Sequence, residues 1–269
     1  MKKDKNMKKI VFAVLFLGFM VTTSCAEVQT QEVKYVSNGV TLNGYLAYDD
    51  NTGEKRPAVL VVHEWWGHND YARKRARMLA ELGYVALAVD MYGDGKTAEH
   101  PDDAGKFAGE VGKNMEGIGK DRFLAALNML KMHPLVDSGN IAAIGYCFGG
   151  GTVLHMARFG VDLKGVVSFH GSLATKTPAE LGQVKAKVLV CHGADDQFVS
   201  QENIDAFKKE MDDAGVDYQF KSYEGAVHGF TNSQADEFAS KFNLLLAYNE
   251  QADKQSWQDM QEFFNSIFD

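Results

Sequence analysis

The chain has 269 residues, of which 45% are apolar and 24% charged, and its net charge is −8. This length and composition are typical of a globular protein with a full core and exclude a disordered chain. The acidic balance argues against nucleic acid as a partner.

The N-terminal segment has the pattern of an export signal. Five lysines within the first nine residues precede an apolar run over 10–21, which is too short to span a bilayer. Small residues then lead to Cys25, as in a relaxed bacterial lipoprotein box where this cysteine becomes the lipidated first residue. Ser24 and Ala26 fit an ordinary signal-peptidase site instead. The expected location is therefore exported, either periplasmic or anchored to the membrane through Cys25.

The predicted organisation is one domain behind that signal. We expect a signal peptide over 1–24, a polar tether over 25–32 and a single α/β domain over 33–269. No internal repeat, low-complexity tract or Pro-rich linker divides the last range.

Short apolar runs alternate along the chain with stretches of helical spacing. Two alternating segments, 33–37 and 40–48, flank Asn38-Gly39, a strong hairpin signal. The later strands are expected at 57–62, 84–89, 140–144, 164–169, 187–191 and 216–223. Apolar spacing predicts helices around 72–80, 123–130, 151–157, 204–211, 238–246 and 257–267. This alternation predicts a doubly wound, mostly parallel sheet with a leading antiparallel hairpin.

The sequence leaves the role of one long connection undecided. The segment from Asp94 to Gly119 is Gly-rich and charged, with a weak helical pattern around 104–111. It fits a lid beside a site or an ordinary connecting helix.

Gly145-Tyr-Cys147-Phe-Gly149 lies between a predicted strand and a predicted helix. This G-x-C-x-G pattern matches the nucleophile elbow of α/β-hydrolases, with Cys in place of Ser. Such a turn strains its central residue and requires small neighbours. It sets the Cys147 sulfur at a helix N-terminus, which favours the thiolate. On the motif alone, an incidental buried cysteine is an equal alternative, and a disulfide with Cys191 also stays open.

Polar residues follow the later predicted strands. Asp196 comes after the strand over 187–191, and His228 comes after the last strand. Ligands of doubly wound sheets bind at the carboxyl ends of the strands. The chain order of nucleophile, acid and histidine is that of α/β-hydrolase triads, so we predict Cys147, Asp196 and His228, with Asp195 as the alternative acid.

No metal site is predicted. His63 and His68 lie five residues apart, whereas the zinc-binding helix motif places its histidines four apart. For His63 we expect strand-end packing or hydrogen bonding.

Several motifs in order resemble the dienelactone hydrolase family, the cysteine-nucleophile branch of the α/β-hydrolases, over roughly residues 33–269. They are His63-Glu-Trp-Trp-Gly67, Asp90-Met-Tyr92, Gly145-Tyr-Cys-Phe-Gly-Gly150, His192-Gly-Ala-Asp-Asp196-Gln-Phe-Val199 and His228-Gly-Phe230. The resemblance implies hydrolysis of a carboxylic ester or lactone through a cysteine thioester, without a cofactor.

The resemblance and the chemistry together imply a role for each residue. Cys147 attacks the carbonyl, and His228 activates the thiol. The backbone N–H groups of Trp65 and Phe148 form the oxyanion hole. The resemblance implies that Glu64 is a carboxylate beside the thiol, where it holds Cys147 protonated at rest; a solvent-facing Glu64 is the alternative.

One departure from the family concerns the substrate. Members that act on chlorocatechol-derived lactones bind the substrate carboxylate with two arginines, and here those places hold Gly93 and Asn232. We therefore expect a small-molecule ester or lactone other than dienelactone. Two other functions stay open: a thioesterase or acyl transferase with the same triad, and a non-catalytic binding protein on a hydrolase scaffold. The sequence predicts no oligomeric state.

Overall fold

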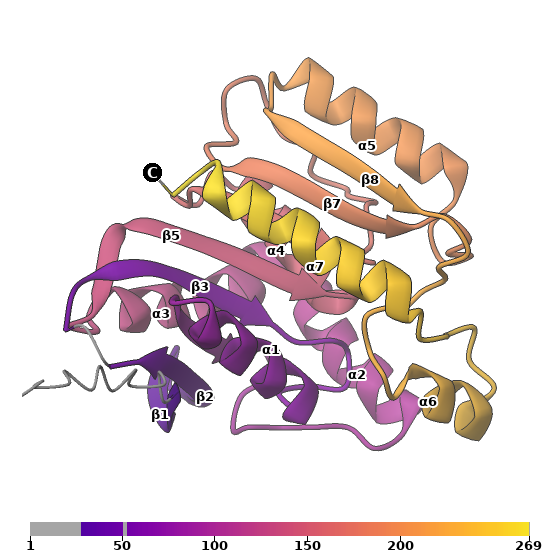
Figure 1. The fold of residues 1–269 in the computed structure, drawn as a ribbon. Coiled ribbons are helices and arrows are strands. Elements are labelled where there is room, and N and C mark those ends of the chain that lie inside the picture. Colours follow the sequence, from indigo (N-terminus) through magenta and orange to yellow (C-terminus); the bar gives the residue numbers. More distant parts are fainter. Residues whose placement is uncertain (1–27, 51–52, 269) are drawn as a thin grey trace, which may run out of the picture.

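The computed structural model describes residues 28–50 and 53–268 as an eight-stranded sheet with helices on both faces (Figure 1). The predicted signal peptide and Cys25 lie outside these residues. Within the described ranges, every helix is too short or too polar to cross a membrane.

The elements alternate along the chain as the sequence predicts. The strands are β1 (Val28–Ser37), β2 (Val40–Asp49), β3 (Arg56–Val62), β4 (Val85–Val89), β5 (Val136–Tyr146), β6 (Gly165–Phe169), β7 (Lys187–Gly193) and β8 (Tyr218–Tyr223). The helices are α1 (Asp70–Glu81), α2 (Pro101–Gly112), the π-helix η1 (Met115–Gly119), α3 (Lys120–Lys131), α4 (Phe148–Arg158), α5 (Gln201–Asp213), α6 (Ala235–Phe242) and α7 (Glu250–Asn265).

The sheet has the order β1-β2-β4-β3-β5-β6-β7-β8. β2 pairs antiparallel with both β1 and β4, and the six strands from β4 to β8 run parallel. Asn38 and Gly39 turn the hairpin with positive φ angles of 49° and 80°, as a two-residue turn between twisted strands requires. The predicted mostly parallel sheet with a leading hairpin is confirmed.

Buried side chains of the central strands divide between two cores, one on each face of the sheet. In β3, Val59 and Val61 pack with residues of α1 and α7, whereas Ala58, Leu60 and Val62 pack with residues of α3, α4 and α5. This alternation follows from the two-residue period of a strand. Because both faces of β3 are covered, its residues 58–62 are all apolar.

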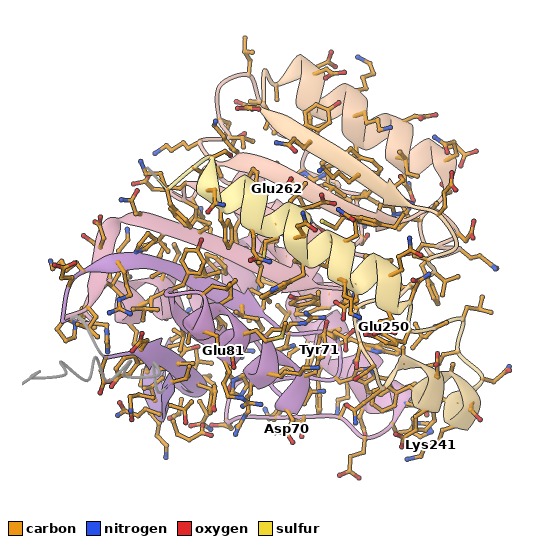
Figure 2. All side chains as sticks on the ribbon, viewed as in Figure 1. Asp70, Tyr71, Glu81, Lys241, Glu250 and Glu262 are labelled. Carbon is orange, nitrogen blue, oxygen red and sulfur yellow. The ribbon has the colours of Figure 1, made fainter. Side chains whose placement is uncertain are left out.

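The outer helices bury one stripe and expose the other. In α7, Met260 and Phe264 are buried, whereas Glu250 and Glu262 are exposed (Figure 2). In α1, Asp70 and Glu81 are exposed in the same way. These helices are amphipathic, as expected of elements that cover a sheet.

The predicted tether is wrong for residues 28–32. They extend β1, and Val28 to Glu32 pair with Asp49 to Tyr45 of β2. Their polar side chains gave no burial signal, but pairing along an edge uses backbone groups and tolerates exposed polar side chains.

The helix predicted around 238–246 ends earlier than expected. α6 stops at Phe242, where Asn243 adopts a left-handed conformation with φ 52°. Asparagine is one of the few residues that cap a helix in this way. Leu244 and Leu246 are thereby released into an irregular segment beside the carboxyl ends of the strands.

Candidate active site

Cys147 occupies a strained turn between β5 and α4. Its backbone has φ 54° and ψ −112°, a region that costs about 1–3 kcal/mol for a residue other than glycine. A Cβ atom added to Gly145 would lie 2.1 Å from the Gly149 carbonyl oxygen, and one added to Gly149 would lie 2.2 Å from that of Val62. The strand and the helix are therefore packed too closely for any other residue, and their rigid packing holds the cysteine in its strained conformation.

His228 and Asp196 meet beside this cysteine. His228 Nδ1 lies 2.8 Å from Asp196 Oδ2, and Asp196 Oδ1 accepts a 2.9 Å hydrogen bond from the N–H of Phe198. The Asp196 side chain is completely buried, whereas Asp195 is exposed. The structure therefore pairs His228 with Asp196 rather than with the alternative acid.

The electrostatics of His228 depend on both neighbours. Burial alone would lower its pKa, but the Cys147 sulfur and the Asp196 carboxylate outweigh that effect and raise the pKa to about 10. Because Nδ1 faces the carboxylate, Nε2 is the nitrogen left for the thiol. At Nε2 the ring can therefore accept the proton of Cys147.

The two described cysteines are both free thiols. Cys191 is fully buried in β7, where burial raises its pKa to about 12 and Tyr223 donates a hydrogen bond to its sulfur. The disulfide that the sequence left open is absent between Cys147 and Cys191.

The predicted oxyanion-hole residues both lie at the pocket that contains Cys147. Trp65 and Phe148 line the same pocket as Cys147 and His228. Among residues 28–50 and 53–268, no backbone hydrogen bond uses the N–H of Trp65 or of Phe148. Phe148 begins α4, where an N–H has no partner within the helix. Both groups are free to donate to a ligand.

Glu64 is buried, with its carboxylate accepting a 2.7 Å hydrogen bond from the Asn232 amide. Burial raises its pKa to about 7, although Asn232 and the charges of His228 and Arg75 oppose the rise. Glu64 is thus brought to the site and does not face solvent. Its side-chain hydrogen bond goes to Asn232.

The pocket over Cys147 has a volume of about 340 Å³ and is mostly apolar. Its lining consists of Trp65, Ala108, Cys147, Phe148, Ser172, Phe198, Val199, His228, Leu244 and Leu246. No lysine or arginine of the described chain belongs to this lining. The pocket therefore fits an uncharged group.

The sequence did not identify several of these pocket residues. The helical spacing around 238–246 includes Leu244 and Leu246, and Asn243, a residue that often caps helices, is the local signal for an earlier end. Phe198 is 57% exposed and packs edge-on against the His228 ring at a centroid distance of 5.0 Å. Ala108 comes from α2, so the long connection contributes to the site, whether or not it moves.

The segment that follows His228 is anchored by a buried polar network. Arg75 of α1 donates to the Thr231 carbonyl at 2.7 Å and forms an ion pair with Asp253 of α7. Tyr71 lies 2.6 Å from the Thr231 hydroxyl. These groups are far apart in the sequence and meet only in the folded chain. They hold the backbone at Thr231, three residues after His228.

The two positions without the expected arginines have different neighbours. Asn232 holds Glu64, as described above. Gly93 lies close to Arg122, but the Arg122 guanidinium donates to the Met91 carbonyl at 2.7 Å and does not line the pocket. No described cation replaces the missing carboxylate clamp.

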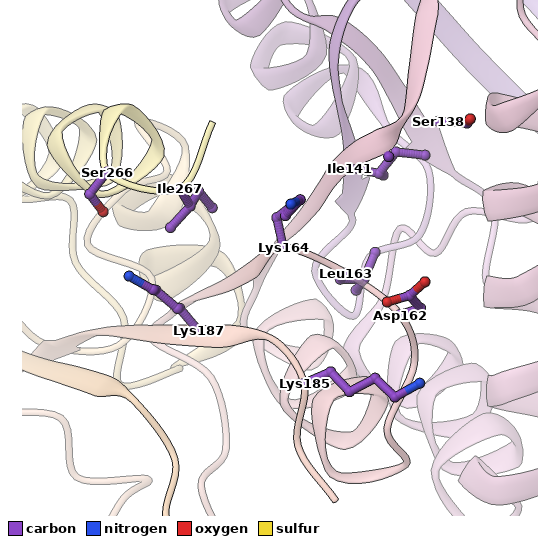
Figure 3. Close-up of a pocket in the computed structure, with 10 residues that line it drawn as sticks. Ser138, Ile141, Asp162, Leu163, Lys164, Lys185, Lys187, Ser266 and Ile267 are labelled. Carbon is purple, nitrogen blue, oxygen red and sulfur yellow. The ribbon is translucent and has the colours of Figure 1, made fainter. Parts of the chain in front are cut away.

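A second pocket, of about 460 Å³, lies at the amino ends of β5, β6 and β7, opposite the end that carries Cys147 (Figure 3). Lys164, Lys185 and Lys187 line it, all are exposed, and their side chains point in different directions (Figure 3). Its described lining has neither cysteine nor histidine, so its larger volume does not make it the candidate site.

Comparisons with known proteins show which family the chain resembles. A model of the dienelactone hydrolase family matches residues 42–268. A putative carboxymethylenebutenolidase of Aquifex aeolicus is 32% identical over 213 residues, which cover 77% of this chain and 89% of that protein. A solved structure named m3DLH is 38% identical, with a TM-score of 0.85 over 90% of this chain and 99% of its own. A dienelactone hydrolase-like promiscuous phosphotriesterase from metagenomic libraries is 36% identical, with a TM-score of 0.82 and the same coverage of both chains.

Proposed function

The chain belongs to the dienelactone hydrolase family, and on that premise we propose that it hydrolyses carboxylic esters or lactones through a thioester on Cys147. One observation carries the proposal. A buried Asp196–His228 pair lies beside a cysteine that a strained turn presents to an apolar pocket.

In the first half of the reaction, His228 Nε2 takes the Cys147 proton and the sulfur attacks the ester carbonyl carbon. The carbonyl oxygen becomes an oxyanion, which the N–H groups of Trp65 and Phe148 stabilise. When the oxyanion collapses, the carbon–oxygen bond to the alcohol breaks and His228 gives its proton to the alcohol. The product of this half is an acyl group bound to Cys147 as a thioester.

In the second half, His228 takes a proton from water as the water oxygen attacks the thioester carbon. The second oxyanion collapses with loss of the Cys147 sulfur, which regains the proton from His228. Asp196 stays ionised throughout, orients the His228 ring and stabilises the imidazolium. The acid product then leaves.

Glu64 is proposed to control the resting state of the thiol. Its pKa of about 7 means that it is neutral at pH 5 and mostly charged at pH 8. The Glu64 carboxylate interacts electrostatically with His228, the partner of the thiol, and we propose that its charge disfavours a second negative charge on Cys147. In the Glu64→Gln variant we therefore expect iodoacetamide to alkylate Cys147 about 10-fold faster than in wild type at pH 8, and at the wild-type rate at pH 5. Gln retains the acceptor for Asn232. Superimposable pH profiles of the two proteins would rule out this role.

The apolar lining predicts which substrates are favoured. A carboxylate bound there would lose solvation without gaining a cationic partner. We expect kcat/KM for phenyl butyrate to exceed that for monophenyl succinate by about 10- to 100-fold. Leu244→Arg supplies a cation at the pocket. It should raise kcat/KM for monophenyl succinate and so reduce the ratio of the two kcat/KM values. Equal rates for both substrates in wild type would contradict this assignment of the pocket.

Phosphotriester hydrolysis is a second candidate, favoured by the uncharged pocket. A phosphotriester is neutral, and the promiscuous phosphotriesterase named above shares 36% of aligned residues with this chain. An ester, lactone and phosphotriester panel, run on wild type beside Cys147→Ala, tests both activities. Turnover of triesters alone would favour the second candidate, and turnover of none would overturn both.

A further inference from the structure

The peptide unit that joins Glu64 to Trp65 carries two groups that matter to the site. It contains the Glu64 carbonyl and the Trp65 N–H, one of the two proposed oxyanion donors. A peptide unit is planar and trans, so these groups point in opposite directions. Whatever fixes the carbonyl of Glu64 therefore fixes the direction of the Trp65 N–H.

His63 holds that carbonyl. Its Nδ1 lies 2.5 Å from the Glu64 oxygen, and its Nε2 lies 3.3 Å from the N–H of Met91. A carbonyl only accepts and a backbone N–H only donates, so Nδ1 carries the proton and Nε2 accepts. The His63 ring thus connects the Glu64–Trp65 peptide to the segment that follows β4.

The surroundings keep the ring in this state. His63 is completely buried, and burial lowers its pKa to about 4, an effect that the hydrogen bond to Glu64 only partly offsets. The ring stacks on Phe148 at a centroid distance of 5.8 Å and meets Tyr92 edge-on at 4.6 Å. It therefore contacts both residues that supply the proposed oxyanion donors, Phe148 by its ring and Trp65 through the shared peptide.

Other hydrogen bonds hold the same turn but do not replace this one. The N–H of Gly67 also donates to the Glu64 carbonyl, at 3.1 Å, from within the turn itself. The Tyr92 hydroxyl donates to the Trp65 carbonyl at 3.0 Å and so restrains the following peptide. Of these contacts, only the His63 ring ties the carbonyl of Glu64 to a separate segment.

We propose that His63 is a positioning residue for the oxyanion hole, whose Nδ1–H fixes the Glu64–Trp65 peptide so that the Trp65 N–H faces the carbonyl oxygen of the bound ester. This inference rests on the proposed function, since it concerns the oxyanion of that reaction. Preorganised donors stabilise the developing charge because they need no reorientation during the reaction.

Three variants separate this role from packing. His63→Phe keeps a ring but has no donor. His63→Gln extends its amide toward the Nε2 position, where its oxygen can accept from Met91, and lacks the donor at the Nδ1 position. His63→Asn places an amide N–H near the Nδ1 position. Each variant is compared with wild type in two reactions of Cys147: acylation by a neutral phenyl ester and alkylation by iodoacetamide. Only acylation generates an oxyanion.

We expect His63→Phe and His63→Gln to acylate roughly 10- to 100-fold more slowly than wild type, and His63→Asn to stay within about 5-fold. Alkylation should stay within about 2-fold in all three. Acylation of His63→Phe and His63→Gln at the wild-type rate would overturn the inference, as would a parallel loss of alkylation. If His63→Phe fails to fold, His63→Gln provides the same comparison. A wild type that forms no acyl-enzyme would instead overturn the proposed function.

Discussion

Cys147→Ala is expected to lower kcat/KM at least about 10⁴-fold for every ester that the wild type hydrolyses, because the variant has no nucleophile to form the thioester. Some residual rate should remain, since binding and the oxyanion donors act without the thiol. The measurement is initial-rate kinetics on the panel of esters and lactones. Retention of full activity by the variant would contradict the mechanism.

Cys191 provides the matched control for that substitution. It is the other thiol of the described chain, but it is buried in β7 and its sulfur accepts a hydrogen bond from the Tyr223 hydroxyl. Cys191→Ala should keep kcat/KM within about 2-fold and lose a small amount of stability, since the substitution removes one buried atom. A large loss of activity in both cysteine variants would mean that the effect of Cys147→Ala is not specific to the elbow.

The second large effect is expected for Asp196→Asn. Asp196 accepts from His228 Nδ1, and an asparagine there no longer stabilises the imidazolium and can impose the wrong tautomer on the ring. We expect kcat to fall roughly 10²- to 10⁴-fold with little change in KM.

The neighbouring aspartate makes this test specific. Asp195 has the same chemistry one residue earlier, but its side chain is exposed. Asp195→Asn removes the same charge from the chain and should keep kcat within about 2-fold. If Asp195→Asn instead produced the large loss and Asp196→Asn did not, the assignment of the acid would be reversed.

Much of the fold could be predicted from local pattern. Asn38-Gly39 predicted the hairpin because a two-residue turn needs positive φ at both positions. Apolar runs such as 57–62 predicted central strands because both faces of such strands are buried. The elbow could also be predicted, because the tight turn requires small residues and the sequence shows them at Gly145 and Gly149.

Local pattern could not supply the contacts between distant segments. The hydrogen bond between Glu64 and Asn232 joins residues 168 positions apart. The choice between Asp195 and Asp196 depends on which side chain turns inward, and adjacent residues carry no local signal for that. For His63 the sequence predicts only packing or hydrogen bonding. One partner, the Glu64 carbonyl, is the next residue, but the other, the N–H of Met91, becomes apparent only when β3 and the segment after β4 lie side by side.

The pocket was the least predictable part. Leu244 and Leu246 have the spacing of a helix, and a single left-handed residue, Asn243, removes them from it. Phe198 follows the acid and packs edge-on against the His228 ring, a contact that its place in the motif His192–Val199 does not predict. We therefore expect substrate preference to depend on the loops around the proposed catalytic residues, while the sheet positions those residues.

A covalent acyl group on Cys147 is the defining intermediate of the proposed reaction. Wild-type protein mixed with a slight excess of a neutral phenyl ester, and quenched in acid within the first turnover, can be digested and analysed by mass spectrometry. We expect the mass of the acyl group to appear on the peptide containing Cys147, to decay as the acid product forms, and to be absent from Cys147→Ala. Steady hydrolysis by wild type with no acyl group on that peptide at any time, together with full activity of Cys147→Ala, would contradict the thioester mechanism.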